Sequence, residues 1–197
     1  LFEQVKKELD TTTLDQPFFK TVLTLSSHEP FDVPLKQIPG EDDASLFLNS
    51  CYYTDKYLGE FIAYCKQQPW WDNTLIIITA DHGHRLPDKI DSRIREKFHI
   101  PLLWLGGAIK KDTVVNRYAG HTDIANTLLA QLDKPSDDFI FSKDIFGNHT
   151  KNFAQYVFID GYGYLDPEHY IVYDNPGKIY FHKEGVTKEE DTYYGRA

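Results

Sequence analysis

Three stretches of the chain have the apolar pattern of β-strands. Leu75–Ala80 is almost unbroken in leucine and isoleucine, which is typical of a strand covered on both faces inside a parallel sheet. Phe98–Leu105 is a second apolar run and ends at Gly106. Phe18–Leu25 alternates apolar and polar side chains after a proline, which predicts a third strand.

Two stretches have the spacing of amphipathic helices. Within Asp42–Gln67 apolar residues recur at threes, fours and sevens, and Pro69 follows the predicted end. A shorter helix is predicted through Ile124–Leu129, with Thr122 or Asp123 as its N-cap. Strands that alternate with helices in this way predict an α/β protein.

The pattern changes after residue 150. Short aromatic and β-branched runs at Tyr156–Ile159, Tyr170–Tyr173 and Lys178–His182 are separated by glycine, proline and asparagine. Such runs predict a small antiparallel β meander.

Composition narrows the possible functions. The 197 residues are 41% hydrophobic, enough for one domain with a good core, and the formal charge of −9 argues against nucleic acid as a partner. No run is long enough to cross a membrane. The chain begins with Leu1 and contains no methionine, so we expect further residues to precede it in the translated protein.

The two cysteines are not expected to form a disulfide. Cys51 and Cys65 lie 14 positions apart in the same predicted helix. At about 1.5 Å rise per residue they would be roughly 21 Å apart, well beyond the reach of a disulfide.

The most informative chemistry follows the first apolar strand, where the chain reads Asp81-His82-Gly83-His84. Open α/β sheets bind ligands outside the carboxyl ends of their strands. Carboxylate oxygens and imidazole nitrogens are also common ligands of divalent metals. The alternative is a polar loop, because Asp and Gly are frequent in turns.

Four stretches then resemble one family. They are Ser26–Phe31 (Ser-Ser-His-Glu-Pro-Phe), Asn49–Asp55, Trp71–Gly83 and Thr122–Leu129, in this order within residues 18–132. Together they resemble the alkaline-phosphatase superfamily, in particular its sulfatase and lipoteichoic acid synthase branch.

The resemblance implies a fold and a cofactor. Members have a mixed, mostly parallel sheet between helices, so residues 1–150 are expected to be the C-terminal part of a sulfatase-like α/β catalytic domain. Residues 151–197 would be a small antiparallel β meander of the same domain. Asp81 and His82 match the family's metal-binding pair, which implies one divalent ion, with manganese preferred over calcium or zinc.

The resemblance also implies that the reaction needs more than this chain. His28 matches a histidine that contacts the transferred phosphate or sulfate, and it is the candidate catalytic residue here. The family's nucleophile, a threonine in the transferases and a modified cysteine or serine in the sulfatases, has no counterpart in this sequence. The fragment alone is therefore expected to be inactive.

Three further residues are candidates for substrate binding. Arg85 could hold an anionic headgroup, or pair at the surface with Asp88 or Asp91. His84 could contact substrate, or it could support the metal ligands without binding the metal itself. His121 could line the crevice near a helix start, or belong to a capped turn.

The resulting hypothesis is a metal-dependent phosphoglycerol transferase or phosphodiesterase that resembles lipoteichoic acid synthase. Its substrate would be an anionic phosphate ester, such as that of a lipid headgroup. By resemblance it would act outside the cytoplasm, in the periplasm or at the cell surface, with the parent protein anchored to the membrane upstream. One alternative is a sulfatase that hydrolyses sulfate esters. Another is a non-catalytic binding or structural domain that keeps the fold.

Overall fold

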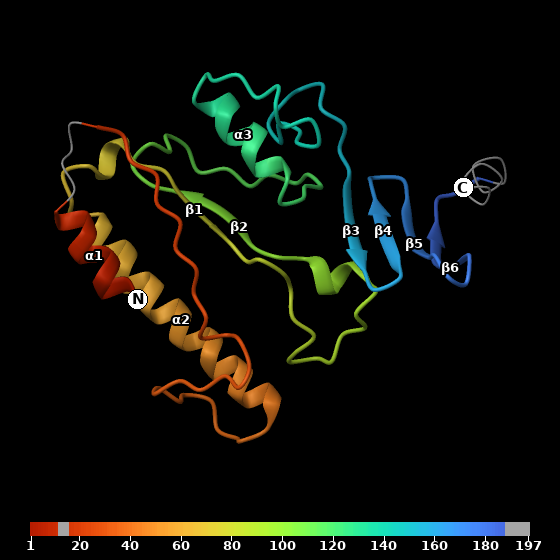
Figure 1. Cartoon of the computed structure of the whole chain (residues 1–197), viewed down its shortest axis with the longest axis horizontal. Helices are drawn as coiled ribbons and strands as arrows, with labels where there is room; N and C mark the ends of the chain where they lie inside the picture. The colour runs from red at the N-terminus through yellow and green to blue at the C-terminus, as the bar shows by residue number, and fades with distance from the viewer. Residues whose placement is uncertain (12–15, 188–197) are drawn as a thin grey trace. The chain divides into compact units, whose positions relative to one another are not determined.

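The computed structural model describes residues 1–11 and 16–187, and it divides into two compact units (Figure 1). Unit 1 consists of Leu1–Ile90 and Ile100–Asp112. Unit 2 consists of Asp91–His99 and Thr113–Ala197. The last ten residues of the predicted meander region, 188–197, lie outside the described residues.

Two helices contribute the buried residues of one core cluster in unit 1. α2 spans Asp43–Cys65, close to the predicted bounds, and the side chain of Asp42 caps it by accepting from the backbone of its first turn. α1, Phe2–Asp10, was not predicted. The buried side chains Val5 and Leu9 of α1 pack against α2. The apolar face of α1 is therefore removed from water by this tertiary contact, which stabilises the short helix.

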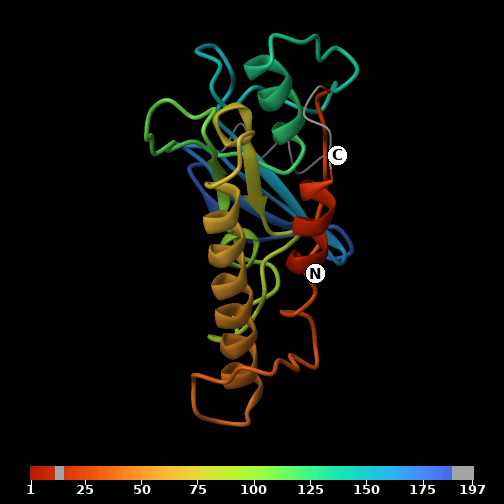
Figure 2. The ribbon, with the colours of Figure 1, turned by 90° about the vertical axis from the view of Figure 1, so that its left-hand side faces the viewer.

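One buried amide holds the chain that leads into α2. Asn49 is fully buried, and its side-chain oxygen accepts from the backbone of Gln37 at 2.6 Å and Ile38 at 2.9 Å. Its amide group donates to the carbonyls of Ile38 and Ser45 at 2.8 and 2.9 Å. Every hydrogen-bonding position of this side chain is therefore used, and the preceding loop turns closely around the start of the helix (Figure 2).

The central apolar run forms β1, Ile76–Thr79, as predicted. Its partner is β2, Leu102–Leu105, and the two strands pair antiparallel, with Ile76 opposite Leu105. The expected parallel neighbours are not seen: all strand pairs in the described ranges are antiparallel. An apolar run reports burial but not the direction of the neighbouring strand, which explains this correction.

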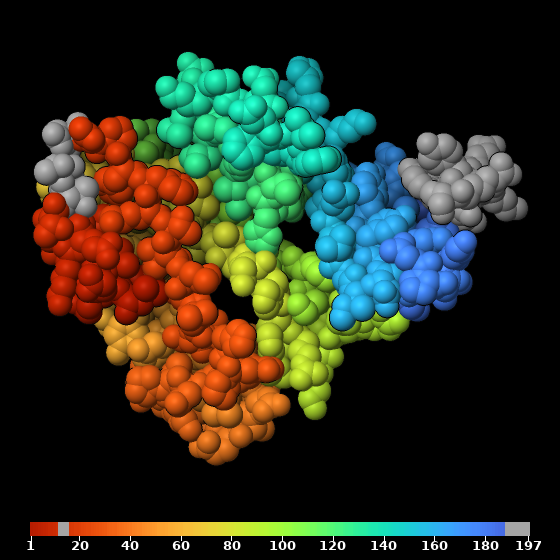
Figure 3. All heavy atoms as spheres, viewed as in Figure 1, coloured from red at the N-terminus to blue at the C-terminus, as the bar shows by residue number. Residues whose placement is uncertain are grey.

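The strand predicted at Phe18–Leu25 is wrong for the described structure. These residues are not assigned to a strand and lie at the surface of unit 1 (Figure 3). Phe19 is 84% exposed and Leu25 is 69% exposed. Alternation predicts a strand only where a neighbouring strand supplies backbone partners, and no described strand pairs with this segment.

Unit 2 contains α3, Asp123–Gln131, with Thr122 as its N-cap residue. Asp123 is only 4% exposed and forms an ion pair with Lys143. It also accepts from the backbone of Gly120 at 2.8 Å and of Lys143 at 3.0 Å. The buried Thr127 accepts from the backbone of Ile145 at 2.9 Å, so α3 is fastened to the chain that follows it.

Up to residue 187, where the described chain ends, the C-terminal meander has four strands, in the order β3, Ala154–Phe158; β4, Gly161–Leu165; β5, Tyr170–Asp174; and β6, Ile179–Glu184. All three junctions are antiparallel, which agrees with the predicted antiparallel meander, although only three of these strands were predicted. β4 was missed because its glycines suggested a turn. Gly163 lies opposite Tyr156, and a Cβ there would collide with the tyrosine ring, so this glycine makes room for a cross-strand aromatic side chain.

The charged segment after residue 90 packs on this meander. The guanidinium of Arg93 lies 4.2 Å from the ring centre of Phe181, and that of Arg95 lies 4.7 Å from the ring centre of Tyr170. Phe98 stacks on Tyr156 at 4.1 Å between ring centres. The arginines thus cover aromatic rings as well as facing solvent.

The α/β class and the antiparallel C-terminal meander are confirmed. In the described part of the chain, none of the helices has the length and apolar character needed to span a membrane.

Burial gives Cys65 a testable property. Both cysteines are free, as expected, and Cys65 is completely buried. Burial raises the pKa of its thiol from 9.0 to about 11. Since the raised pKa belongs to the folded state, its contribution to stability is complete below pH 9 and is lost as the pH rises toward about 11.

We expect native Cys65 to react with a thiol reagent at pH 8 at least about 100-fold more slowly than in urea, because two pKa units reduce the thiolate a hundredfold. Cys51, which is only partly buried, is the internal reference. Equal native reaction rates for the two thiols would contradict the burial of Cys65.

Candidate functional site

Asp81 and His82 follow β1 after one intervening residue, at the predicted end of the strand. Both side chains are exposed, 71% for Asp81 and 65% for His82. The His82 Nε2 and Asp81 Oδ2 atoms are 3.8 Å apart, and Asp81 Oδ1 accepts from the His82 backbone at 3.0 Å. A carboxylate and an imidazole therefore lie side by side and open to solvent.

The hydrogen bonds of His82 determine which ring nitrogen is available. Its Nδ1 lies 3.0 Å from the carbonyl oxygen of Gly83. A carbonyl can only accept, so Nδ1 carries the hydrogen, and Nε2 of the neutral ring keeps its lone pair beside Asp81. This arrangement is usual for a metal-ligating histidine.

The donor set fits part of a divalent metal site. Asp81 and His82 have the right chemistry, but the described residues contain no group of three or more His, Cys, Asp or Glu side chains placed to hold an ion. This loop offers two candidate ligands, which are too few for a complete coordination shell.

His28 lies in a tight turn of unit 1. Its backbone donates to the carbonyl of Leu25 at 3.0 Å, and its own carbonyl accepts from Phe31 at 2.9 Å. Its Nδ1 donates to the carbonyl of Glu29 at 2.9 Å, so here too Nε2 is the nitrogen left for another partner. The exposed imidazole can accept through Nε2 or, once protonated, donate to an anion.

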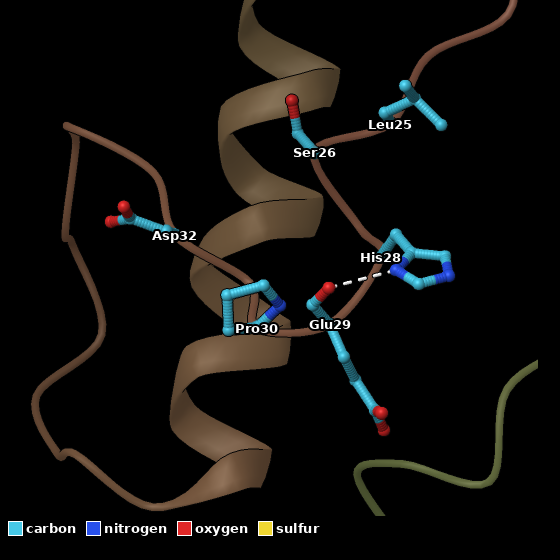
Figure 4. A pocket seen from close by; sticks show the side chains of 6 residues that line it. All are labelled: Leu25, Ser26, His28, Glu29, Pro30 and Asp32. Atoms are coloured by element: carbon cyan, nitrogen blue, oxygen red, sulfur yellow. Dashed lines mark hydrogen bonds between the residues drawn. The ribbon is translucent and has the colours of Figure 1, made fainter.

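A shallow hollow of about 360 Å³ adjoins this turn. Its lining residues are Leu25, Ser26, His28, Glu29, Pro30 and Asp32. Figure 4 shows the imidazole of His28 and the carboxylate of Glu29 extending to the same side of the loop, while the side chain of Asp32 points away from the imidazole. The turn therefore presents His28 in an accessible position.

His84 differs from the other two histidines. Its ring stacks on Phe47 of α2, with 4.6 Å between centres, and meets Phe31 edge-on at 5.7 Å. Its Nδ1 accepts from the backbone of Leu86 at 3.1 Å. This half-buried imidazole packs against two aromatic rings of unit 1, and one of its ring nitrogens already accepts a hydrogen bond.

The remaining candidates are exposed. Arg85 lies at the surface of unit 1, and it forms no ion pair with Asp88 or Asp91. Asp91 instead pairs with Arg93 at 2.6 Å. His121 is exposed just before α3 and belongs to unit 2, whereas the other candidates belong to unit 1.

Sequence reasoning missed the residues that join the two site loops. Phe31 is 4% exposed and has a φ of 61°, an uncommon backbone conformation for an aromatic residue. It also meets the ring of Phe47 at 5.6 Å. Its only sequence signal was its place at the end of the Ser26–Phe31 match.

Comparison with known proteins identifies relatives. The sulfatase family model matches residues 1–134. Phosphoglycerol transferase I of Xanthomonas euvesicatoria pv. vesicatoria is 31% identical over 123 residues, which cover 60% of this chain and 18% of that protein. Lipoteichoic acid synthase 2 of Bacillus subtilis is 25% identical over 198 residues, covering 90% and 29%, respectively. Lipoteichoic acid synthase of Staphylococcus aureus (strain USA300) is 24% identical over 209 residues, covering 89% and 32%.

A solved structure supports the fold. A protein of the alkaline phosphatase superfamily from Vibrio parahaemolyticus has a TM-score of 0.75, with 24% sequence identity. The match covers 98% of this chain and 50% of that one. The chain thus spans less than a third of these curated relatives and half of the solved protein.

Proposed function

This chain belongs to the sulfatase family, and from that membership we propose that it forms the C-terminal part of a metal-dependent phosphoglycerol transferase or phosphodiesterase. The matched relatives are named as transferases and synthases, which favours group transfer from a glycerol phosphate ester. In this proposal residues 1–150 belong to the catalytic domain and residues 151–197 form its small β part. The parent protein would act outside the cytoplasm, anchored to the membrane.

The observation that carries the proposal is the exposed Asp81 and His82 pair after β1. Its accessible carboxylate and the Nε2 lone pair of His82 would hold one side of a divalent cation, manganese by preference, and other parts of the parent protein would complete the shell. When bound, the cation would neutralise charge on the phosphoryl oxygens and lower the pKa of the attacking group.

The other candidate residues would act on the substrate. His28 would contact the phosphoryl oxygens or protonate the leaving group through Nε2, because its Nδ1 is committed to Glu29. Arg85 is exposed and could bind an anionic headgroup with its planar guanidinium. His121 remains a candidate for substrate contact, and the nucleophile would come from outside this chain.

The test uses the full-length protein and a lipid with a glycerol phosphate headgroup. We expect Mn²⁺-dependent release or transfer of glycerol phosphate, at least about 100-fold above the same protein in EDTA, because a metal contributes several kcal/mol to phosphoryl transfer. An aryl sulfate assayed in parallel tests the sulfatase alternative. Cleavage of the sulfate ester alone would replace our proposal with that alternative. If the folded protein turns over neither ester in Mn²⁺, the non-catalytic alternative is favoured. The incomplete set of metal donors among the described residues is also consistent with that alternative.

A further inference from the structure

Three aromatic rings from separate parts of unit 1 meet beside the candidate site. Phe31 follows the turn of His28, Phe47 lies on α2, and His84 follows Asp81 and His82. The ring centres are 5.6 Å apart for Phe31 and Phe47, 5.7 Å for Phe31 and His84, and 4.6 Å for Phe47 and His84. This Phe31–Phe47–His84 cluster connects two loops that are about 50 residues apart in sequence.

The ring of His84 is fixed in this cluster by a hydrogen bond as well as by stacking. Its Nδ1 accepts from the backbone of Leu86 at 3.1 Å, and Leu86 is 6% exposed. Turning the ring would leave a backbone N–H without its acceptor in a poorly hydrated place, which is unfavourable. The loop of Asp81 and His82 is thus held at β1 on one side and at His84 on the other.

The cluster holds the turn of His28 in the same way. Phe31 is buried, its backbone donates to the carbonyl of His28 at 2.9 Å, and its φ of 61° is a conformation that surrounding contacts must maintain. The rings of His84 and Phe47 provide these contacts. A displacement of the His84 ring would therefore displace both loops.

We infer that His84 is a positioning residue, which orients Asp81 and His82 relative to His28 through Phe31 and Phe47. The inference rests on the proposed function for the roles of these three side chains. It assigns His84 to packing behind the site and not to contact with substrate.

Three variants of the full-length protein separate the stacking of this ring from its hydrogen bond with Leu86. His84→Phe keeps the stacking but removes the acceptor for the Leu86 N–H. His84→Asn provides an acceptor but no aromatic ring, and His84→Ala removes both. His149→Ala is the matched control, because His149 is an exposed histidine in the other unit.

The main readout is the dissociation constant for Mn²⁺ alone, measured by electron paramagnetic resonance of the free ion without substrate. We expect about 10- to 100-fold weaker binding in His84→Ala, the range seen when groups behind metal ligands are removed. His84→Phe and His84→Asn should give smaller losses, and His149→Ala none. At saturating Mn²⁺, His84→Ala should lower kcat with little change in KM.

Other outcomes would overturn the inference. Unchanged Mn²⁺ affinity with a raised KM would make His84 a substrate contact, and unchanged affinity with a lower melting temperature in EDTA would make its role purely structural. If His84→Ala does not fold, the Phe and Asn variants decide in the same assays. Asp81→Asn is titrated with Mn²⁺ in the same experiment. If Asp81→Asn weakens Mn²⁺ binding and the His84 variants do not, only the positioning role of His84 fails. If neither Asp81→Asn nor the His84 variants weaken Mn²⁺ binding, the proposed metal site fails as well.

Discussion

Replacing Asp81 with asparagine in the full-length protein should lower turnover of a glycerol phosphate lipid by about three orders of magnitude. The substitution removes a negative charge where we place the metal, and metal stabilisation of the transition state is worth several kcal/mol. An asparagine oxygen can still accept from the His82 backbone, as Asp81 does at 3.0 Å. The local turn should therefore survive while the charge is lost.

The measurement is initial rate at saturating Mn²⁺, with a thermal melt to verify folding. Asp88→Asn is the matched control, since Asp88 is an exposed carboxylate in the same loop region and should retain full activity. Retention of more than a tenth of wild-type turnover by Asp81→Asn would remove the metal from our proposal.

Replacing Asp123 with alanine should destabilise the protein by about 3–5 kcal/mol, the range expected when one partner of a buried ion pair is removed. The side chains of Asp123 and Lys143 are only 6% and 14% exposed. The alanine variant leaves the ammonium of Lys143 without its carboxylate and the backbone of Gly120 without its acceptor. Its cost should therefore exceed that of any exposed carboxylate in unit 2.

Urea unfolding, followed by circular dichroism, measures this loss. Asp123→Asn keeps an acceptor and should lose less, while Asp138→Ala changes an exposed carboxylate nearby and should stay within about 0.5 kcal/mol of wild type. A loss below about 1 kcal/mol for Asp123→Ala would show that the pair contributes far less than a buried pair should.

Several parts of this molecule could be predicted because their signals are local. α2 follows from apolar spacing and the proline after it, and β1 follows from a short apolar run. The place of Asp81 and His82 also needed only a strand end followed by two ligand-type side chains. The resemblance to the sulfatase branch rested on short ordered matches, and the sulfatase model confirmed it over residues 1–134.

Errors arose where a residue's environment is supplied by distant parts of the chain. Phe18–Leu25 alternates like a strand, yet pairing requires a neighbour, and no described strand pairs with it. Gly163 favours a turn when the sequence is considered alone, but in the structure it lies in a strand opposite the ring of Tyr156. Asn49 and Asp123 gave no sign in the sequence that they would be buried.

The sequence by itself determined the family and the main helices, and it named the candidate side chains for binding a metal or an anion, because residue type and spacing carry that information. Only the tertiary structure decided how the histidines differ: it leaves Nε2 of His28 and His82 for outside partners and uses Nδ1 of His84 within the fold. The reason is physical, since each tautomer depends on a carbonyl or N–H group that folding brings to the ring.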